Sequence, residues 1–207
     1  MTNNSILLYN ELGDCMLFAS NNLGKVKEVS EILKTNVLSL KDIDKKIEIN
    51  ENKETFMENA ILKAKEIYKQ TGLPTLADDS GLEIEVLNGF PGVLTHRFLG
   101  SDKTDSDRNQ AILDLMKDKT NRTCYFTCSL AYFDGINLIT EEYRLKGSIA
   151  DSEKINQGFG FDSIFLYEGK YLSDMTLDEK NKISPRQIAL TNLAKDKNFQ
   201  KNIDFIN

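Results

Sequence analysis

Two adjacent carboxylates, Asp78 and Asp79, stand between the apolar pair Leu76 and Ala77 and the glycine Gly81. Glycine permits backbone conformations that are closed to other residues, so we expect a strand to give way to a turn at Asp79. Strand ends are where α/β proteins place their chemistry, and neighbouring carboxylates repel each other unless a cation such as Mg²⁺ balances them. The pair therefore indicates either a metal-assisted site or a solvated Asx turn, which is the commoner fate of such a motif.

A second polar group, Ser20, Asn21 and Asn22, follows a short apolar strand predicted at residues 16–19 and precedes a helix. Helix N-termini present free N–H groups that bind phosphate. Lys25 in the first turn opposes the helix dipole, so we expect an anion nearby. The alternative is that Ser20 or Asn22 only caps the helix while Lys25 extends into solvent. The segment has no P-loop pattern.

A longer helix is predicted to begin at the capping box formed by Thr55 and Glu58 and to end at Gly72. Its apolar stripe is expected to face the sheet and consists of Met57, Ala60, Ile61, Ala64 and Tyr68. This phase places Lys63 and Asn59 on the opposite face. Glu51 lies just before the helix in sequence, so the Lys63 ammonium group and the Glu51 carboxylate would lie beside the same cleft.

A glycine-bracketed aromatic, Phe159 between Gly158 and Gly160, precedes Phe161 and Asp162. The glycines leave the Phe159 ring accessible and let the backbone approach whatever stacks on it, as a planar base would. The alternative is the bulged start of a strand.

Two further helix starts carry cations. A capping box at Thr176 begins a short helix that carries Lys180, and Pro185 takes the favoured first position of the next helix. Arg186 beside it opposes the dipole, so we expect it to face an acceptor on a ligand.

The order of predicted elements indicates an α/β fold. Strand, loop and helix alternate in the first half, and a hairpin at Asp134-Gly135 joins two long strands in the second. The chain length suits one large domain or two lobes that share a sheet over residues 15–207, preceded by a loosely ordered extension at residues 1–14.

The composition excludes several classes of protein. The 207 residues carry a net charge of −6, which disfavours a nucleic-acid-binding surface. The three cysteines lack partners for a zinc site and fit a reduced, cytoplasmic compartment as small core residues, and His96 is the only histidine. No apolar run reaches the length of a membrane span, and the first residues lack the features of a secretory signal.

Six motifs occur in an order shared with one known family. They are ASNNLGK (19–25), TFMENAILKA (55–64), ADDSGL (77–82), PGV (91–93), GFGFD (158–162) and EKN (179–181). From about residue 17 to about residue 193 the chain resembles the Ham1/inosine triphosphate pyrophosphatase family. The resemblance implies an elongated mixed sheet with helices, two lobes around a central cleft, and a homodimer. It also implies Mg²⁺-dependent hydrolysis of ITP, dITP and XTP to the monophosphate and pyrophosphate, which sanitises the nucleotide pool.

The resemblance also implies roles for particular residues. Asp79 would be the base that activates water for attack on the α-phosphorus and, with Glu51, a metal ligand, while Asp78 would support it. Lys63 would contact the phosphates. The other residues expected to bind substrate are Ser20, Asn21, Asn22, Lys25, Ser80, Phe159, Gly160, Phe161, Asp162, Lys180, Pro185 and Arg186. Selection of a 6-oxo purine over adenine needs donors aimed at that oxygen, and Arg186 is the candidate donor.

The chain departs from the family pattern at two positions. The family usually has Ser-His-Arg where this chain has Ser184-Pro185-Arg186, and Asp-Pro where it has Asp162-Ser163. Pro185 supplies no side-chain donor, so one base contact is lost and the discrimination against standard triphosphates is open. The alternatives are a non-catalytic nucleotide-binding sensor and a related pyrophosphatase with another base preference.

Overall fold

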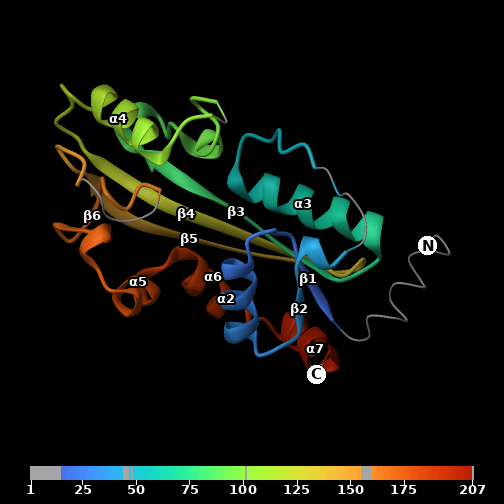
Figure 1. The fold of residues 1–207 in the computed structure, drawn as a ribbon. Helices are drawn as coiled ribbons and strands as arrows, with labels where there is room; N and C mark the ends of the chain where they lie inside the picture. Colours follow the sequence, from blue (N-terminus) through green and yellow to red (C-terminus); the bar gives the residue numbers. More distant parts are fainter. Residues whose placement is uncertain (1–14, 44–46, 48, 101, 155–159, 207) are drawn as a thin grey trace. The chain divides into compact units, whose positions relative to one another are not determined.

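The structure is a computed structural model that describes residues 15–43, 47, 49–100, 102–154 and 160–206. The expected extension at residues 1–14 and the aromatic residue Phe159 lie outside the described residues. Figure 1 shows the order of the elements along the chain. No helix within the described ranges combines the length and the apolar character needed to cross a bilayer.

The predicted α/β class is confirmed by a mixed sheet and several helices. The strands are β1 (Met16–Phe18), β2 (Val37–Leu38), β3 (Thr75–Ile84), β4 (Thr123–Phe133), β5 (Leu138–Ile149), β6 (Phe165–Tyr167) and β7 (Lys170–Tyr171). The helices are α2 (Leu23–Leu33), α3 (Phe56–Thr71), α4 (Asp105–Leu115), α5 (Leu177–Ile183), α6 (Pro185–Leu193) and α7 (Lys197–Ile206).

The strands are hydrogen bonded in the order β2-β1-β3-β4-β5-β6-β7. Strand β1 runs parallel to both β2 and β3, whereas β6 runs antiparallel to β5 and β7. Parallel neighbours need crossover connections, and α2 and α3 are these connections.

The chain divides into two compact units. Unit 1 comprises the described residues up to Asp79, together with Cys128–Tyr143 and the chain from Arg186 onward. Unit 2 comprises Ser80–Thr127 and Arg144–Pro185.

In unit 1, helices cover both faces of the sheet, because successive strand residues point to opposite sides. One face packs against α2, α6 and α7 through a cluster that includes Phe18, Leu76 and Leu130. The other face packs against α3 through a cluster that includes Leu17 and Ala77. Figure 1 shows α3 on one side of β1 and β3, with α2 and α6 on the other.

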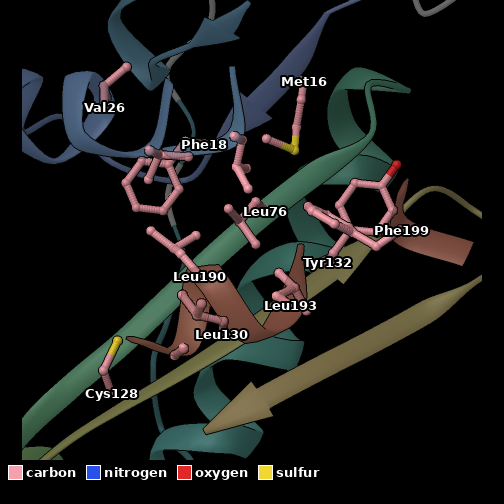
Figure 2. Packing of buried hydrophobic residues seen from close by; sticks show 13 residues of the cluster. Met16, Phe18, Val26, Leu76, Cys128, Leu130, Tyr132, Leu190, Leu193 and Phe199 are labelled. Carbon is pink, nitrogen blue, oxygen red and sulfur yellow. The ribbon is translucent and has the colours of Figure 1, made fainter. Parts of the chain in front are cut away.

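Figure 2 shows how the side chains of the first of these clusters pack against one another. Leu190 and Leu193 of α6 lie over Leu76 and Leu130, and Phe199 of α7 meets the Tyr132 ring edge-on at 4.9 Å between centroids. Cys128 lies in the same cluster, and Cys15, Cys124 and Cys128 are all buried as free thiols. Burial raises the pKa of Cys124 and of Cys128 to about 12, so both thiols stay protonated. The predicted role of the cysteines as small core residues is confirmed.

Unit 2 contains α4, α5, β6 and β7 with the adjoining parts of the three long strands. Its apolar centre includes the rings of Phe161 and Phe165, which both contact Phe126. The predicted capping box of α5 is confirmed, since Thr176 and Glu179 each accept a backbone hydrogen bond from the other.

Candidate functional site

Asp78 and Asp79 lie inside β3, not at its end. The prediction that the strand gives way to a turn at Asp79 is wrong: β3 continues to Ile84, and Gly81 does not have a positive φ angle. Because the strand continues through the pair, the two side chains point to opposite faces of the sheet. Asp78 shares the face of Leu76, which packs on α2 and α6, and Asp79 shares the face of Ala77, which packs on α3.

Asp78 is a buried carboxylate held by two cations, with its side chain 4% exposed. Its Oδ2 accepts from Lys25 Nζ at 3.0 Å and from Arg186 Nε and Nη2 at 3.1 and 3.0 Å. Burial alone would raise the pKa of Asp78, but the charges of Arg186, Lys25 and Lys63 outweigh it and hold the pKa well below its usual range. The group is therefore a permanent anion.

The loop between β1 and α2 is organised by its own hydrogen bonds. Asn22 is the N-cap of α2, and its Oδ1 accepts from the N–H groups of Gly24 and Lys25 at 2.9 and 3.3 Å. Ser20 Oγ accepts from the Asn22 N–H at 3.1 Å, and Asn21 is exposed. The capping alternative is therefore confirmed for Asn22. The anion expected beside Lys25 is present as the Asp78 carboxylate.

Asp79 faces a different set of groups, contributed by α3 and the segment before it. Lys63 Nζ donates to the Asp78 carbonyl oxygen at 2.7 Å and lies 3.2 Å from Glu51 Oε2. The pKa of Asp79 is raised to about 6, first by burial and further by the negative charges of Glu51 and Asp78. Lys63 and a hydrogen bond from Asn59 lower it by less. A carboxyl with this pKa can both take up and release a proton near neutral pH.

The predicted phase of α3 is wrong by part of a turn. The buried residues of the helix are Phe56, Asn59, Ala60, Ala64, Ile67 and Thr71. Asn59 is fully buried and accepts from the Lys53 N–H at 3.0 Å, and the Lys63 side chain is only 12% exposed. Both polar residues therefore lie toward the sheet, because β3 offers them a carboxylate and a carbonyl oxygen.

The donor set around Asp79 fits Mg²⁺. Within the described residues no group of three or more His, Cys, Asp or Glu side chains converges as a metal cage would require. However, Mg²⁺ is usually bound by one or two carboxylates, with water and substrate phosphates filling the remaining positions. Asp79 and Glu51 supply two such carboxylates. A divalent cation would relieve the crowding of negative charge that raises the pKa of Asp79.

A second group of predicted site residues lies in unit 2. Lys180 Nζ of α5 contacts Asp162 Oδ2 at 2.6 Å, and Gly160 has a positive φ of 61°. Phe161 is 5% exposed and packs against Phe126. Its ring therefore supports the segment from within, and its contact with a base stays a prediction.

The remaining predicted residues have simpler positions. Ser80 is a half-buried residue of β3, Pro185 is the first residue of α6, and His96 is exposed. Arg186 meets its acceptor within the chain: besides binding Asp78, its Nη1 lies 3.4 Å from Glu28 Oε2. Three of its five donor hydrogens point at protein carboxylates, and its contact with a ligand acceptor stays a prediction.

Sequence reasoning did not identify Glu28, which lies on α2 and contacts Arg186 at 3.4 Å. Lys25 and Glu28 are three residues apart on this helix and therefore share a face. Once Lys25 is assigned to an inward-facing position, this spacing identifies Glu28 as a neighbour of the same site.

Comparison with known proteins gives a consistent result. The model of the Ham1 family matches residues 16–196. The chain is 40% identical over 190 residues to the dITP/XTP pyrophosphatase of Borrelia duttonii (strain Ly), which covers 87% of this chain and 95% of the relative. It is 41% identical over 187 residues to the dITP/XTP pyrophosphatase of Bacillus subtilis (strain 168), covering 86% and 94% respectively.

The fold is similar to that of a solved structure, a HAM1 protein from Coxiella burnetii. The TM-score is 0.82 at 35% sequence identity, and the match covers 87% of this chain and 96% of the other.

Proposed function

This chain belongs to the Ham1 family, and on that premise we propose that it hydrolyses non-standard purine nucleoside triphosphates to the monophosphate and pyrophosphate. The substrates would be dITP, XTP and ITP. The names of the relatives support the substrate class. The arrangement of charged residues in unit 1 supports the chemistry.

The observation that carries the proposal is the contrast between the two neighbouring acids. Asp78 is a fixed anion among cations, whereas the pKa of Asp79 is raised to about 6 on the face shared with Lys63 and Glu51. Phosphoryl transfer requires positioning and charge neutralisation more than covalent help from the protein. A carboxylate with a pKa near neutrality, next to an ammonium group, is suited to remove a proton from attacking water.

In this mechanism each residue has a limited task. Asp79 orients a water molecule and accepts its proton, and Lys63, held by the Asp78 carbonyl and Glu51, presents positive charge to the phosphates. The N-terminus of α2 and Lys25 provide further positive potential for the triphosphate. Asp79 and Glu51 would hold Mg²⁺. When bound, the metal would neutralise phosphate charge and lower the pKa of bound water.

Recognition of the base would fall to unit 2. We assign Phe159, Gly160, Phe161, Asp162 and Lys180 to the base and sugar, with the pair between Asp162 and Lys180 fixing both side chains. Arg186 stays the candidate donor to the 6-oxo group of the base. Ser80 and Pro185 stay assigned to substrate contacts.

The homodimer and the cytoplasmic location of the protein stay predictions. Light scattering would test the dimer.

The experiment is a substrate panel with purified protein and Mg²⁺. We expect pyrophosphate release from ITP, dITP and XTP, with kcat/KM at least about 100-fold above that for ATP and GTP. Release of orthophosphate alone would overturn the proposal. Equal turnover of the standard triphosphates would instead support a different base preference, for which Pro185 is the structural reason.

Asp79→Asn separates an enzyme from a nucleotide-binding sensor. We expect kcat to fall by about 10²–10⁴-fold with nucleotide binding retained, because the amide cannot accept the proton. Asp118→Asn, on the exposed surface, is the matched control and should leave kcat unchanged. A wild-type protein that binds nucleotide without turnover would identify the sensor.

A further inference from the structure

Two side chains of helix α4 form hydrogen bonds with the segment of unit 2 that contains Gly160. Asp105 and Asn109 are four residues apart and therefore lie on one face of the helix. Asp105 Oδ2 accepts from the Gly160 N–H at 2.9 Å, and Asn109 Nδ2 donates to the Gly160 carbonyl oxygen at 3.0 Å. The backbone N–H and C=O groups of Gly160 are thus both bound to side chains of the same helix.

Asn109 is also the centre of a buried polar network. Its Nδ2 lies 2.7 Å from Glu153 Oε1 and 2.9 Å from Ser163 Oγ, and Ser163 Oγ itself donates to Glu153 Oε1 at 3.0 Å. Ser106 Oγ of the same helix donates to Glu153 Oε2 at 2.8 Å. Asn109 is 1% exposed and Ser163 is 6% exposed, so water competes little for these hydrogen bonds.

The chemistry of the network determines which side chain can occupy position 109. All three neighbours of Asn109 Nδ2 offer oxygen acceptors, so the amide must present its N–H₂ group to them. An aspartate there would set a second carboxylate against Glu153. An apolar residue would leave the half-buried Glu153 carboxylate and the Gly160 carbonyl oxygen with one donor fewer, and acceptors that are partly shielded from water are costly to leave unsatisfied.

These hydrogen bonds hold residues on both sides of Asp162, in the segment that the proposed function assigns to the base. Gly160 is held by Asp105 and Asn109, Ser163 is held by Asn109 and Glu153, and Asp162 lies between these two anchors. The Asp162 carboxylate reaches Lys180 at 2.6 Å. A displacement of Gly160 or Ser163 would therefore move Asp162 relative to Lys180.

We propose that Asn109, assisted by Asp105, is a positioning residue that fixes segment 160–163 for recognition of the purine base. Asn109 acts through the backbone of Gly160 and the hydroxyl of Ser163, without touching the substrate. This inference rests on the proposed function. It adds a determinant of base affinity outside the residues expected to contact nucleotide.

The test measures the base and the phosphate contributions separately. Affinity for inosine monophosphate, KM and kcat for ITP with Mg²⁺, and inhibition by inorganic pyrophosphate are compared for the wild type and for Asn109→Ala. We expect the dissociation constant for the monophosphate and the KM to rise about tenfold, as for the loss of about 1.4 kcal/mol of binding free energy. The kcat and the inhibition by pyrophosphate should change less than about twofold.

Two further variants keep the test decisive. Asp105→Ala removes the anchor of the Gly160 N–H and a long ion pair with Arg108, whose atoms are 3.7 Å apart. Because the Asp105 side chain is 48% exposed, the variant should fold and raise KM about threefold even if Asn109→Ala does not fold. Gln110→Ala lies on the exposed face of the same helix, where its amide contacts Asp114, and should change none of these values.

The outcomes that overturn the inference are specific. An unchanged KM in Asn109→Ala and Asp105→Ala, or an equal loss of monophosphate and pyrophosphate affinity, would show that α4 has no selective effect on the base. A wild type that binds inosine monophosphate without hydrolysing ITP would overturn the proposed function alone, because the binding comparison still applies. A wild type that does not bind the monophosphate would overturn both.

Discussion

Asp78 and Asp79 are adjacent in sequence, yet their carboxyl groups have pKa values shifted in opposite directions. Asp78 meets Lys25 and Arg186 on one face of β3, which outweighs the cost of burial. Asp79 on the other face meets one lysine and one acid, so the effect of burial dominates and its pKa rises to about 6. The difference between the two residues thus follows from which helix covers each face.

Removing the charge of Asp78 should destabilise the protein strongly. In Asp78→Asn the cations Lys25 and Arg186 keep their partly buried positions without this counter-charge, and breaking such an arrangement typically costs about 3–5 kcal/mol. Urea unfolding at neutral pH measures the change in unfolding free energy. Glu31→Gln, which removes an exposed pair with Lys27, is the control and should change it by less than about 0.5 kcal/mol.

The pH dependence of the Asp78 effect has a definite sign. The folded-state pKa of Asp78 lies below its unfolded value of 3.8, so its contribution to stability is present above that value. The contribution is lost as the pH falls, and the gap between wild type and Asp78→Asn should narrow below about pH 4. A gap that is constant with pH would contradict the assignment.

The negative charge of Asp79, unlike that of Asp78, should destabilise the folded protein when a chelator has removed Mg²⁺. Its carboxyl titrates near 3.8 in the unfolded chain and near 6 in the folded protein, so the folded state binds the proton more tightly. Stability from this group is therefore full below about pH 4 and falls as the pH rises through about 6. At pH 7 Asp79→Asn should be more stable than the wild type by about 3 kcal/mol, and at pH 4 this advantage should nearly vanish. Denaturant unfolding at the two pH values is the measurement, and a larger advantage at pH 4 would contradict the prediction.

At the scale of elements, the position of each strand and helix face determines which groups meet. Strand β3 continues where a turn was predicted, and this continuity separates the two acids. Helix α3 is rotated from its predicted phase, and this rotation brings Lys63 and Asn59 to the sheet. In both cases the packing of neighbouring elements decided the outcome more than the local sequence did.

The contact between β5 and β6 provides a test of packing at this scale. A Cβ atom added at Gly147 of β5 would lie 2.5 Å from the Leu166 carbonyl oxygen and would also collide with the Phe165 ring. Because backbone and a buried ring cannot yield easily, Gly147→Ala should lower the unfolding free energy by about 1–3 kcal/mol. The neighbouring exposed Lys146→Ala is the control. A variant as stable as the wild type would show that the two strands are less closely packed.

At the scale of the whole molecule, acidic residues outnumber basic ones, 32 to 26. In the described part of the chain, the basic residues of the candidate site in unit 1, Lys25, Lys63 and Arg186, each contact a carboxylate. Such an arrangement can accept a small phosphate compound together with a divalent cation. A nucleic acid backbone requires a continuous positive surface, which the net negative charge and the pairing of these basic residues disfavour.

We therefore expect no binding to duplex DNA. Fluorescence anisotropy of a short labelled duplex at low ionic strength should show no saturable binding up to about 10 μM protein, because net repulsion is strongest there. The same experiment with labelled single-stranded RNA is the companion control. Binding that weakens with added salt would contradict the prediction and indicate a basic surface.

The sequence by itself determined the class of fold, the helix starts and the residues that could do chemistry. The caps at Thr55 and Thr176 depend on neighbours within a few residues, and the β–α alternation depends on the order of motifs along the chain. Only the tertiary structure decided which groups these residues meet. Arg186 lies 108 positions from Asp78, and Asn109 lies 51 positions from Gly160. The phase of a helix and the continuation of a strand depend on what packs against them, so pairings of this kind arise only when the sheet and its covering helices are assembled.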